Sequence, residues 1–356
     1  MQGIHRRSVL SGLGFGAGAL ALGGSAGRVF AQGEELVVVA TGGAFEKALK
    51  DHFYDAFTQA TGIRIRPVAA SNAETWTKLR AMQQTGRVEW DIVTAWPEDL
   101  VAQAALLENF DCAKISSLAA QAVDNACTGR GLLRTLGAVT LVHDARKFPN
   151  GGPTTWAEFW DVNRFPGPRT MPNAGAPWWP LMAALQADGV DKDKLFPLDL
   201  DRAFAKLDQL RPHITVWWRT GDQSQQIFRS GEVSLGMIWS GRAFALQKEG
   251  MPIQVSYAGA PPNTALWAIP KGARNVQASL RFLDFFTGRP EAHVPFSDAV
   301  TFDTLNKVAL SRLTPEQRKD RVTTPENSRQ LAQMDATWVA ENRAGLLDRW
   351  NRWLAR

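Results

Sequence analysis

Two turns in this sequence place small, hydroxyl-bearing and aromatic residues directly after short apolar runs. The first turn supplies Thr41, Gly42, Gly43 and Phe45, and the second supplies Thr94 and Trp96. Glycines allow a backbone to approach a ligand closely, and the N-terminus of a following helix favours negative charge. A tryptophan beside them can stack on an apolar or cationic molecule. These residue types predict recognition of a small molecule, with an ordinary tight turn and a core tryptophan as the alternatives.

Later in the chain an arginine stands near acidic, amide and aromatic residues. This group consists of Trp218, Asp222, Gln223 and Arg242. The planar fork of a guanidinium binds both oxygens of a carboxylate, so Arg242 is a candidate clamp for an acidic ligand. A solvated arginine, or one in a salt bridge between two lobes, is the competing interpretation. Because the chain contains 14 tryptophans, most of them must belong to the core or the surface.

The sequence offers no recognisable catalytic arrangement. Its five histidines are scattered along the chain, at His5, His52, His143, His213 and His293. Neither a G-x-S-x-G elbow nor an H-E-x-x-H motif is present. These absences give no support to a catalytic site, and we expect neither enzymatic activity nor a metal or cofactor. A periplasmic hydrolase, with a site assembled from distant residues, is retained as an alternative.

The first 31 residues have the layout of an export signal. Arg6 and Arg7 precede a weakly apolar stretch over residues 10–22, and Ala31 ends a segment that a signal peptidase could recognise. Paired arginines indicate the twin-arginine route. A transmembrane anchor is disfavoured because the apolar run is short and rich in glycine. We expect cleavage near Ala31 and a periplasmic mature protein.

The mature chain has the size of two domains and little excess charge. Removing 31 of the 356 residues leaves 325, which favours more than one core. The leader also carries Arg6, Arg7 and Arg28, so its loss lowers the formal net charge from +5 to +2. This small excess argues against a nucleic-acid partner. Cys112 and Cys127 form either a disulfide or two buried thiols, since the compartment is oxidising but the loop geometry is not visible.

The elements that must position these candidates follow an α/β pattern. Residues 36–40 read as a buried strand, the apolar face from Phe45 as a helix, and residues 63–68 as a second strand. Such a β-α-β unit implies a parallel pair. Residues 90–94 form a further strand, and a short strand over residues 139–142 marks a crossing to a second lobe. We expect two α/β lobes joined by a hinge of several strands.

At this point the chain resembles the spermidine/putrescine-type periplasmic solute-binding proteins of ABC importers. The carriers are Glu89-Trp90-Asp91-Ile92-Val93, Thr155-Trp156-Ala157-Glu158-Phe159-Trp160-Asp161, Gly236-Met237-Ile238-Trp239-Ser240-Gly241 and Trp267-Ala268-Ile269-Pro270-Lys271-Gly272. The resemblance implies a type II periplasmic binding protein fold with a ligand cleft between the lobes. Lobe 1 would contain residues 34–138 and 263–306, and lobe 2 residues 139–262 and 307–356.

The resemblance also assigns roles to the candidates. The turn of Thr41, Gly42, Gly43 and Phe45, the pair Thr94 and Trp96, and Trp239 would form walls of the pocket. The partners would be a small-molecule ligand and the inner-membrane permease subunits of an ABC importer, with the binding protein itself a monomer. A sensor role is compatible with the same fold.

One departure from that family bears on the ligand. Polyamine binders hold ammonium groups with pocket carboxylates, but three stretches that correspond to pocket loops contain no Asp or Glu: residues 41–44, residues 172–177 with Asn173, and residues 263–265. Desolvating a dication without carboxylates costs several kcal/mol per charge. We therefore expect an amino acid, a carboxylate or a neutral organic ligand. Arg242 or Arg219, together with Asp222, would suit a zwitterion.

Two alternatives of the same fold remain. One is a true polyamine binder. The other is a ferric-iron binder, a class that commonly uses neighbouring tyrosines, whereas Tyr54 and Tyr257 are far apart in this sequence.

Overall fold

A computed structural model describes residues 34–356. The predicted export signal of residues 1–31, including its cleavage near Ala31, lies outside the described residues. The strands are β1 (Glu35–Ala40), β2 (Arg64–Ala69), β3 (Ile92–Ala95), β4 (Leu132–Asp144), β5 (Arg169–Pro172), β6 (Ile214–Trp218), β7 (Leu235–Trp239), β8 (Ile253–Ser256), β9 (Pro262–Ala268) and β10 (Asp303–Thr304).

The helices are short except for the last one. They are α1 (Ala44–Leu49), α2 (Asp55–Thr61), α3 (Asn72–Gln84), α4 (Pro97–Ala102), α5 (Leu118–Gln121), α6 (Trp156–Trp160), α7 (Trp178–Ala187), α8 (Leu200–Leu210), α9 (Gly221–Arg229), α10 (Ser240–Lys248), α11 (Val276–Thr287), α12 (Pro290–Val300), α13 (Lys307–Ser311), α14 (Pro315–Lys319), α15 (Pro325–Ser328) and α16 (Ala336–Leu354). A π-helical turn at Lys50–Tyr54 joins α1 to α2. Short 3₁₀ turns lie at Ala104–Leu106, Cys112–Lys114 and Arg211–His213.

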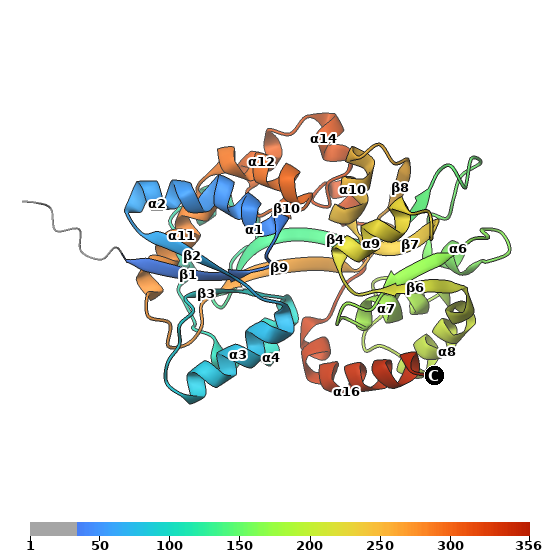
Figure 1. The fold of residues 1–356 in the computed structure, drawn as a ribbon, viewed down its shortest axis with the longest axis horizontal. Coiled ribbons are helices and arrows are strands. Elements are labelled where there is room, and N and C mark those ends of the chain that lie inside the picture. Colours follow the sequence, from blue (N-terminus) through green and yellow to red (C-terminus); the bar gives the residue numbers. More distant parts are fainter. Residues whose placement is uncertain (1–33) are drawn as a thin grey trace, which may run out of the picture. The chain divides into compact units, whose positions relative to one another are not determined.

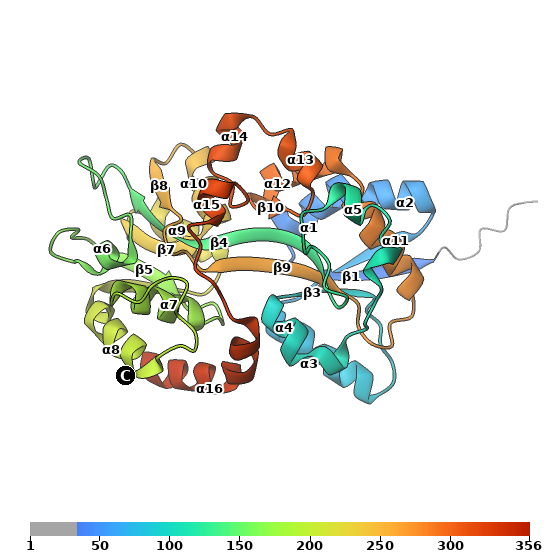
Figure 2. The same ribbon diagram turned by 180° about the vertical axis from the view of Figure 1, so that it is seen from behind.

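The strands form a mixed sheet in the order β2-β1-β3-β9-β4-β7-β5-β6, and β8 and β10 also pair with β4. β1 and β2 are parallel, which confirms the predicted β-α-β unit. β9 runs antiparallel to both β3 and β4, and β4 runs antiparallel to β7. Strands β4 and β9 therefore lie side by side between the two groups of parallel strands (Figures 1 and 2).

The side chains of β1 alternate between two cores. Leu36 and Val38 enter one apolar cluster with Phe53 and Phe57, while Val37 and Val39 enter another with residues of α3. Successive strand residues point to opposite faces, so a strand covered by helices on both faces is apolar throughout. Figure 1 shows this arrangement, with α3 and α4 on one face of the sheet and α1, α2 and α11 on the other.

The crossing strand is longer than the sequence analysis predicted. Instead of a short strand at residues 139–142, β4 has 13 residues, of which all but one are buried. Residues 132–138 pair with β9, and residues 139–144 pair with β7 and β8. Because β4 is buried on both faces even at polar residues such as Arg134 and Thr140, the alternation of apolar and polar residues does not mark its ends. The second group of strands has its own apolar clusters, with α7 and α8 on one side and α9 and α10 on the other.

We expect the free energy of unfolding to fall in mild acid because of His293. This residue is fully buried between the rings of Phe53 and Phe286, and its Nε2–H donates to the carbonyl of Phe286. Burial lowers the pKa of His293 to about 4 from its ordinary value of 6.5. Below pH ~6.5 the unfolded chain binds a proton at this residue that the folded chain does not, so stability is lost as the pH falls toward 4.

At pH 5 the expected loss from His293 is about 2 kcal/mol, measured by urea denaturation at pH 7.5 and 5. A His293→Gln variant removes the titrating group and should lose less stability over this interval than the wild type does. Equal losses in the two proteins would exclude His293 as the cause.

Candidate functional site

The carboxyl ends of β1 and β3 carry the first group of predicted site residues. Thr41 is exposed, and Gly43, with a φ of 70°, is the N-cap of α1. That left-handed conformation favours glycine at this turn. Gly42 lies so close to Ala69 that a Cβ at residue 42 would be only 2.8 Å from the Ala69 methyl group. Thr94 donates its hydroxyl proton to the carbonyl of Val39 at 3.1 Å. The turn is tightly built, and Thr41 and Gly43 are its exposed members.

Beside Thr94 lies a buried guanidinium that the sequence analysis missed. Arg134 is 4% exposed, donates from Nη1 to the Thr94 hydroxyl at 2.6 Å, and stacks between the rings of Phe45 and Trp267. It occupies an irregularity of β4, where the pairing with β9 shifts register. Burial lowers the pKa of Arg134 to about 10. No carboxylate of residues 34–356 lies within 4 Å of it, so its charge is held by aromatic faces and one hydroxyl.

Tryptophans from separate elements meet in what we call the tryptophan cluster, formed by Trp96, Trp178, Trp179, Trp218 and Trp239. The ring centroids of Trp96 and Trp179 are 6.2 Å apart, those of Trp179 and Trp239 are 6.5 Å apart, and those of Trp239 and Trp218 are 5.1 Å apart. The cluster brings together Trp96 and Trp239, which lie 143 positions apart in the sequence and were both predicted as pocket walls. Trp179 stands between them and was not predicted.

The indole N–H groups of three cluster members have no hydrogen-bond partner. They belong to Trp178, Trp179 and Trp239, and all are buried without an acceptor among the described residues. A buried donor left unpaired costs about 1–3 kcal/mol. Such a group needs an explanation, and a ligand acceptor is one.

A small pocket opens at the cluster, which we call the tryptophan pocket. Its lining consists of Trp96, Pro97, Glu98, Trp178, Trp179, Pro262, Asn263, Thr264 and Met334. About 10 Å³ of free space remains, which is room for a single water molecule. A solute of several heavy atoms therefore fits only if the walls move apart.

Glu98 is the functional candidate that the sequence analysis overlooked. It is 2% exposed and makes no salt bridge within the described part of the chain. Burial, followed by the charge of Asp99, raises the pKa of Glu98 to about 7. Glu98 lies outside the three acid-free stretches of residues 41–44, 172–177 and 263–265, and it adds a carboxyl group to the tryptophan pocket. The sequence could have pointed to Glu98, because this residue follows Trp96, a predicted wall residue, and Pro97 at the start of α4.

The neighbouring acid, Asp99, has a different environment. It is fully buried and pairs with Arg343 of α16 at 2.7 Å, while Arg343 also donates to the Asn72 side chain. The Arg343 guanidinium lies 5.8 Å from the Trp96 ring and 5.7 Å from that of Trp178. Helices α4 and α16 are thus joined beside the tryptophan pocket, and Asp99 is neutralised while Glu98 is not.

Several predicted residues are engaged elsewhere. Trp218 has no exposed surface and donates its indole proton to the carbonyl of Met237, so it packs as a core residue. The Asn173 amide oxygen accepts a hydrogen bond from Trp350. Arg242 pairs with Asp222, whose side chain is 87% exposed. Gln223 accepts a hydrogen bond from the backbone N–H of Arg219. None of these five predicted residues, Trp218, Asn173, Arg242, Asp222 and Gln223, lines the tryptophan pocket.

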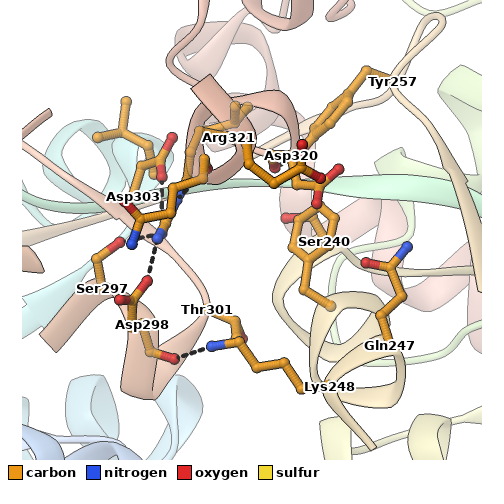
Figure 3. A pocket seen from close by; sticks show the side chains of 15 residues that line it. Ser240, Gln247, Lys248, Tyr257, Ser297, Asp298, Thr301, Asp303, Asp320 and Arg321 are labelled. Carbon is orange, nitrogen blue, oxygen red and sulfur yellow. Dashed lines mark hydrogen bonds and ion pairs between the residues drawn. The ribbon is translucent and has the colours of Figure 1, made fainter. Parts of the chain in front are cut away.

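A larger cavity of about 300 Å³ lies between α10, α12 and α14, and it shares no residue with the tryptophan pocket (Figure 3). Arg321 lies in its wall and contacts Ser297, Asp298 and Asp303. On the other side are Tyr257 and Gln247. None of the residues predicted from the sequence lines this cavity.

Cys112 and Cys127 form a disulfide, which is one of the two alternatives that the sequence left open. Within residues 34–356, no group of three or more His, Cys, Asp and Glu side chains is arranged to hold a metal ion. None of the helices in this region combines the length and apolar character needed to cross a bilayer.

Comparison with known proteins gives a consistent result. A family model described as bacterial extracellular solute-binding protein matches residues 52–316. A γ-aminobutyric acid-binding protein of Pseudomonas aeruginosa is 30% identical over 360 residues, covering 99% of this chain and 97% of that protein. A spermidine/putrescine-binding periplasmic protein of Escherichia coli is 23% identical over 283 residues, covering 76% of this chain and 79% of that protein.

The fold is shared with a solved structure. An ABC transporter substrate-binding protein from Bradyrhizobium japonicum superimposes with a TM-score of 0.82 at 30% identity, covering 90% of this chain and 99% of that one. This likeness confirms the predicted α/β fold of the periplasmic binding proteins. The chain belongs to the family of bacterial extracellular solute-binding proteins, which capture small molecules for import by ABC transporters.

Proposed function

We propose that this protein captures a small zwitterionic amino acid of the γ-aminobutyrate class at the tryptophan cluster. The observation that carries the proposal is Glu98, a buried acid without an ion pair that lines a pocket together with Trp96, Trp178 and Trp179. A carboxylate among aromatic faces suits an ammonium group. The unpaired indole donors of the same cluster suit the carboxylate at the other end of the solute.

The similarity to a γ-aminobutyric acid-binding protein supports the same class of ligand. Arg134 is a further cation within hydrogen-bonding distance of Thr94, a predicted wall residue. In contrast, the pocket supplies a single acid, whereas a polyamine carries an ammonium group at each end and would leave at least one of them without a carboxylate.

Capture would proceed by closure of two lobes. We assign residues 34–138 and 263–306 to lobe 1, and residues 139–262 and 307–356 to lobe 2, with β4 and β9 among the hinge strands. Under this assignment Trp96 and Glu98 belong to lobe 1, and Trp178, Trp179 and Met334 belong to lobe 2. The walls of the tryptophan pocket would then separate when the lobes open, which would admit the solute.

The leader of residues 1–31 would direct export, with cleavage near Ala31 and a monomeric protein in the periplasm. The closed, loaded form would dock on the permease subunits of an ABC importer. The solute would be held by hydrogen bonds, ion pairing and stacking, without bond-breaking chemistry.

A thermal-shift and calorimetric comparison of ligands tests this function. γ-Aminobutyrate should raise the melting temperature of the mature protein more than spermidine, glutarate or n-butylamine does, because a ligand that binds the folded state stabilises it by mass action. Glutarate carries a second carboxylate in place of the ammonium group, and n-butylamine lacks the carboxylate, so each analogue misses one charged group of the zwitterion. Submicromolar affinity for spermidine, with none for γ-aminobutyrate, would refute the proposed ligand class.

We expect Trp239→Ala to weaken γ-aminobutyrate binding by about 1–3 kcal/mol, as measured by calorimetry, because a central aromatic residue anchors a buried ligand. Trp239 is partly exposed, and its indole lies between Trp179 and Trp218. Trp338→Ala, which removes a tryptophan packed on Phe196 outside the cluster, is the matched control. A folded Trp239→Ala protein with wild-type affinity would place Trp239 outside the site.

A further inference from the structure

The cavity between α10, α12 and α14 has the size of a ligand site but is not part of the solute site proposed above. Its volume of about 300 Å³ lies at the lower end of the range for small-molecule pockets. The tryptophan pocket and this cavity have no lining residue in common. We refer to it below as the α10–α12 cavity.

The charges around the α10–α12 cavity do not balance. Four carboxylates line it, those of Asp298, Asp303, Glu316 and Asp320, whereas the lining cations are Lys248 and Arg321. The wall therefore carries an excess of two negative charges. Isolated charges of one sign in a concave surface raise the local concentration of counter-ions of the opposite sign.

The two cations are already engaged within the wall. Arg321 pairs with Asp298 and with Asp303, at 3.4 Å from the latter, and also contacts the Ser297 hydroxyl. Lys248 donates to the backbone carbonyl of Asp298 at 2.6 Å. Figure 3 shows these contacts gathered on one side of the cavity.

Glu316 and Asp320 are the two lining carboxylates that Arg321 does not pair with. Neither forms a salt bridge with any residue that the structure describes. Both side chains are exposed. Partial desolvation of Asp320, with a contribution from the charge of Glu316, raises the pKa of Asp320 above its ordinary value. Both acids lie in or next to the short helix α14, so the two negative charges are held on one wall.

The rest of the lining suits a hydrocarbon chain. Leu136, Phe244 and Val322 supply apolar surface, and Tyr257, whose hydroxyl donates to the carbonyl of Asp320, supplies an aromatic ring. A chain of methylene groups would bury apolar area against these residues. An ammonium group at the end of the chain would meet a carboxylate, and the aromatic ring adds a cation–π contact.

We propose that the α10–α12 cavity is a second ligand site that binds a small aliphatic diamine, with its ammonium groups paired to Glu316 and Asp320. This inference goes beyond the solute-binding function and does not depend on the identity of the solute. The diamine site would be occupied independently of the tryptophan pocket.

Calorimetry with 1,4-diaminobutane tests the second site on three proteins, all kept at low ionic strength because salt screens partly exposed charges. The wild type should bind one diamine, and the double variant Glu316→Gln/Asp320→Asn should bind it at least tenfold more weakly. The double variant Glu326→Gln/Glu341→Gln removes the same charge from exposed positions outside the cavity and should bind as the wild type does. n-Butylamine, with one ammonium group, should bind more weakly than the diamine.

The outcomes that would refute the diamine site differ from those that would refute γ-aminobutyrate binding at the tryptophan pocket. Absence of diamine binding to the wild type, equal losses in the two double variants, or displacement of the diamine by γ-aminobutyrate would each refute it. A folded Glu316→Gln/Asp320→Asn protein should retain wild-type affinity for γ-aminobutyrate. If γ-aminobutyrate fails to bind while diamine binding responds to the cavity variant, the proposed function fails and the second site stands.

Discussion

Replacing Glu98 with glutamine is expected to weaken γ-aminobutyrate binding by about 2–4 kcal/mol, or roughly thirty- to seven-hundred-fold in Kd. Glutamine keeps the shape of the side chain but removes the charge that would pair with the solute ammonium in a buried, aromatic-lined pocket. A charge-assisted hydrogen bond would become a neutral one, in a place where water cannot compensate. Calorimetry on folded protein measures the change.

The same residue should make solute binding depend on pH. The pKa of Glu98 in the free protein is raised to about 7, so the carboxylate is largely protonated at pH 6 and largely ionised at pH 8. Binding of an ammonium group requires the ionised form. Affinity should therefore rise with pH below about 7, by up to tenfold per unit, and level off above it. The Glu98→Gln variant should show no such rise.

The control for this experiment is Glu89→Gln, which removes an exposed acid nine residues earlier. Its affinity and pH profile should match those of the wild type. Two results would remove Glu98 from the site: a Glu98→Gln protein with unchanged affinity, or a wild-type affinity that is constant from pH 6 to 8.

Removing the disulfide is expected to lower the free energy of unfolding by about 3 kcal/mol. Cys112 and Cys127 are separated by 15 positions, and a cross-link that closes a loop of this length restricts mainly the unfolded chain. Urea denaturation of the wild type and of Cys112→Ser/Cys127→Ser measures the difference. In the wild type, treatment with dithiothreitol should produce a similar loss.

The disulfide variant should nevertheless bind γ-aminobutyrate within about twofold of the wild type. Neither cysteine lines the tryptophan pocket or the α10–α12 cavity. An unfolding midpoint that is the same with and without the cysteines would contradict the expected contribution. A large loss of affinity in the folded variant would show that the disulfide acts on the site.

The parts of the fold that were predictable from the sequence are those encoded by local patterns. β1, α2 and β2 were visible because residues 36–40 are continuously apolar, the next segment repeats its apolar residues on one helical face, and Gly62 ends the helix in a left-handed conformation. The capping pair Ser71 and Glu74 marks the start of α3 in the same way. Each signal lies within a few residues of the element that it predicts.

The length of β4 and the position of β9 were not predictable in this way. β4 makes pairs with four other strands, and all four lie more than 90 residues later in the chain. Its continuous burial depends on those partners, so the apolar run alone does not reveal where the strand begins.

Two tryptophans show most clearly which features of the site could not be predicted from the local sequence. Trp218 and Trp239 each end a strand, and both were predicted as pocket residues, Trp218 from its neighbours in the sequence and Trp239 from the family resemblance. In the structure Trp218 bonds to the Met237 carbonyl and is fully buried, whereas the Trp239 indole N–H has no partner. Their centroids are 5.1 Å apart, so the difference arises from the direction of each ring and not from local composition.

The α/β class, the parallel β1–β2 pair and the resemblance to the solute-binding family could be read from the chain, because apolar periodicity and short motifs are local properties. The environments of the charged residues could not. Glu98 is buried without a counter-charge among residues 34–356, Asp99 beside it pairs with Arg343, and the carboxylates of Glu316 and Asp320 line one cavity. Arg343 lies 244 positions after Asp99, so no local pattern contains this pairing.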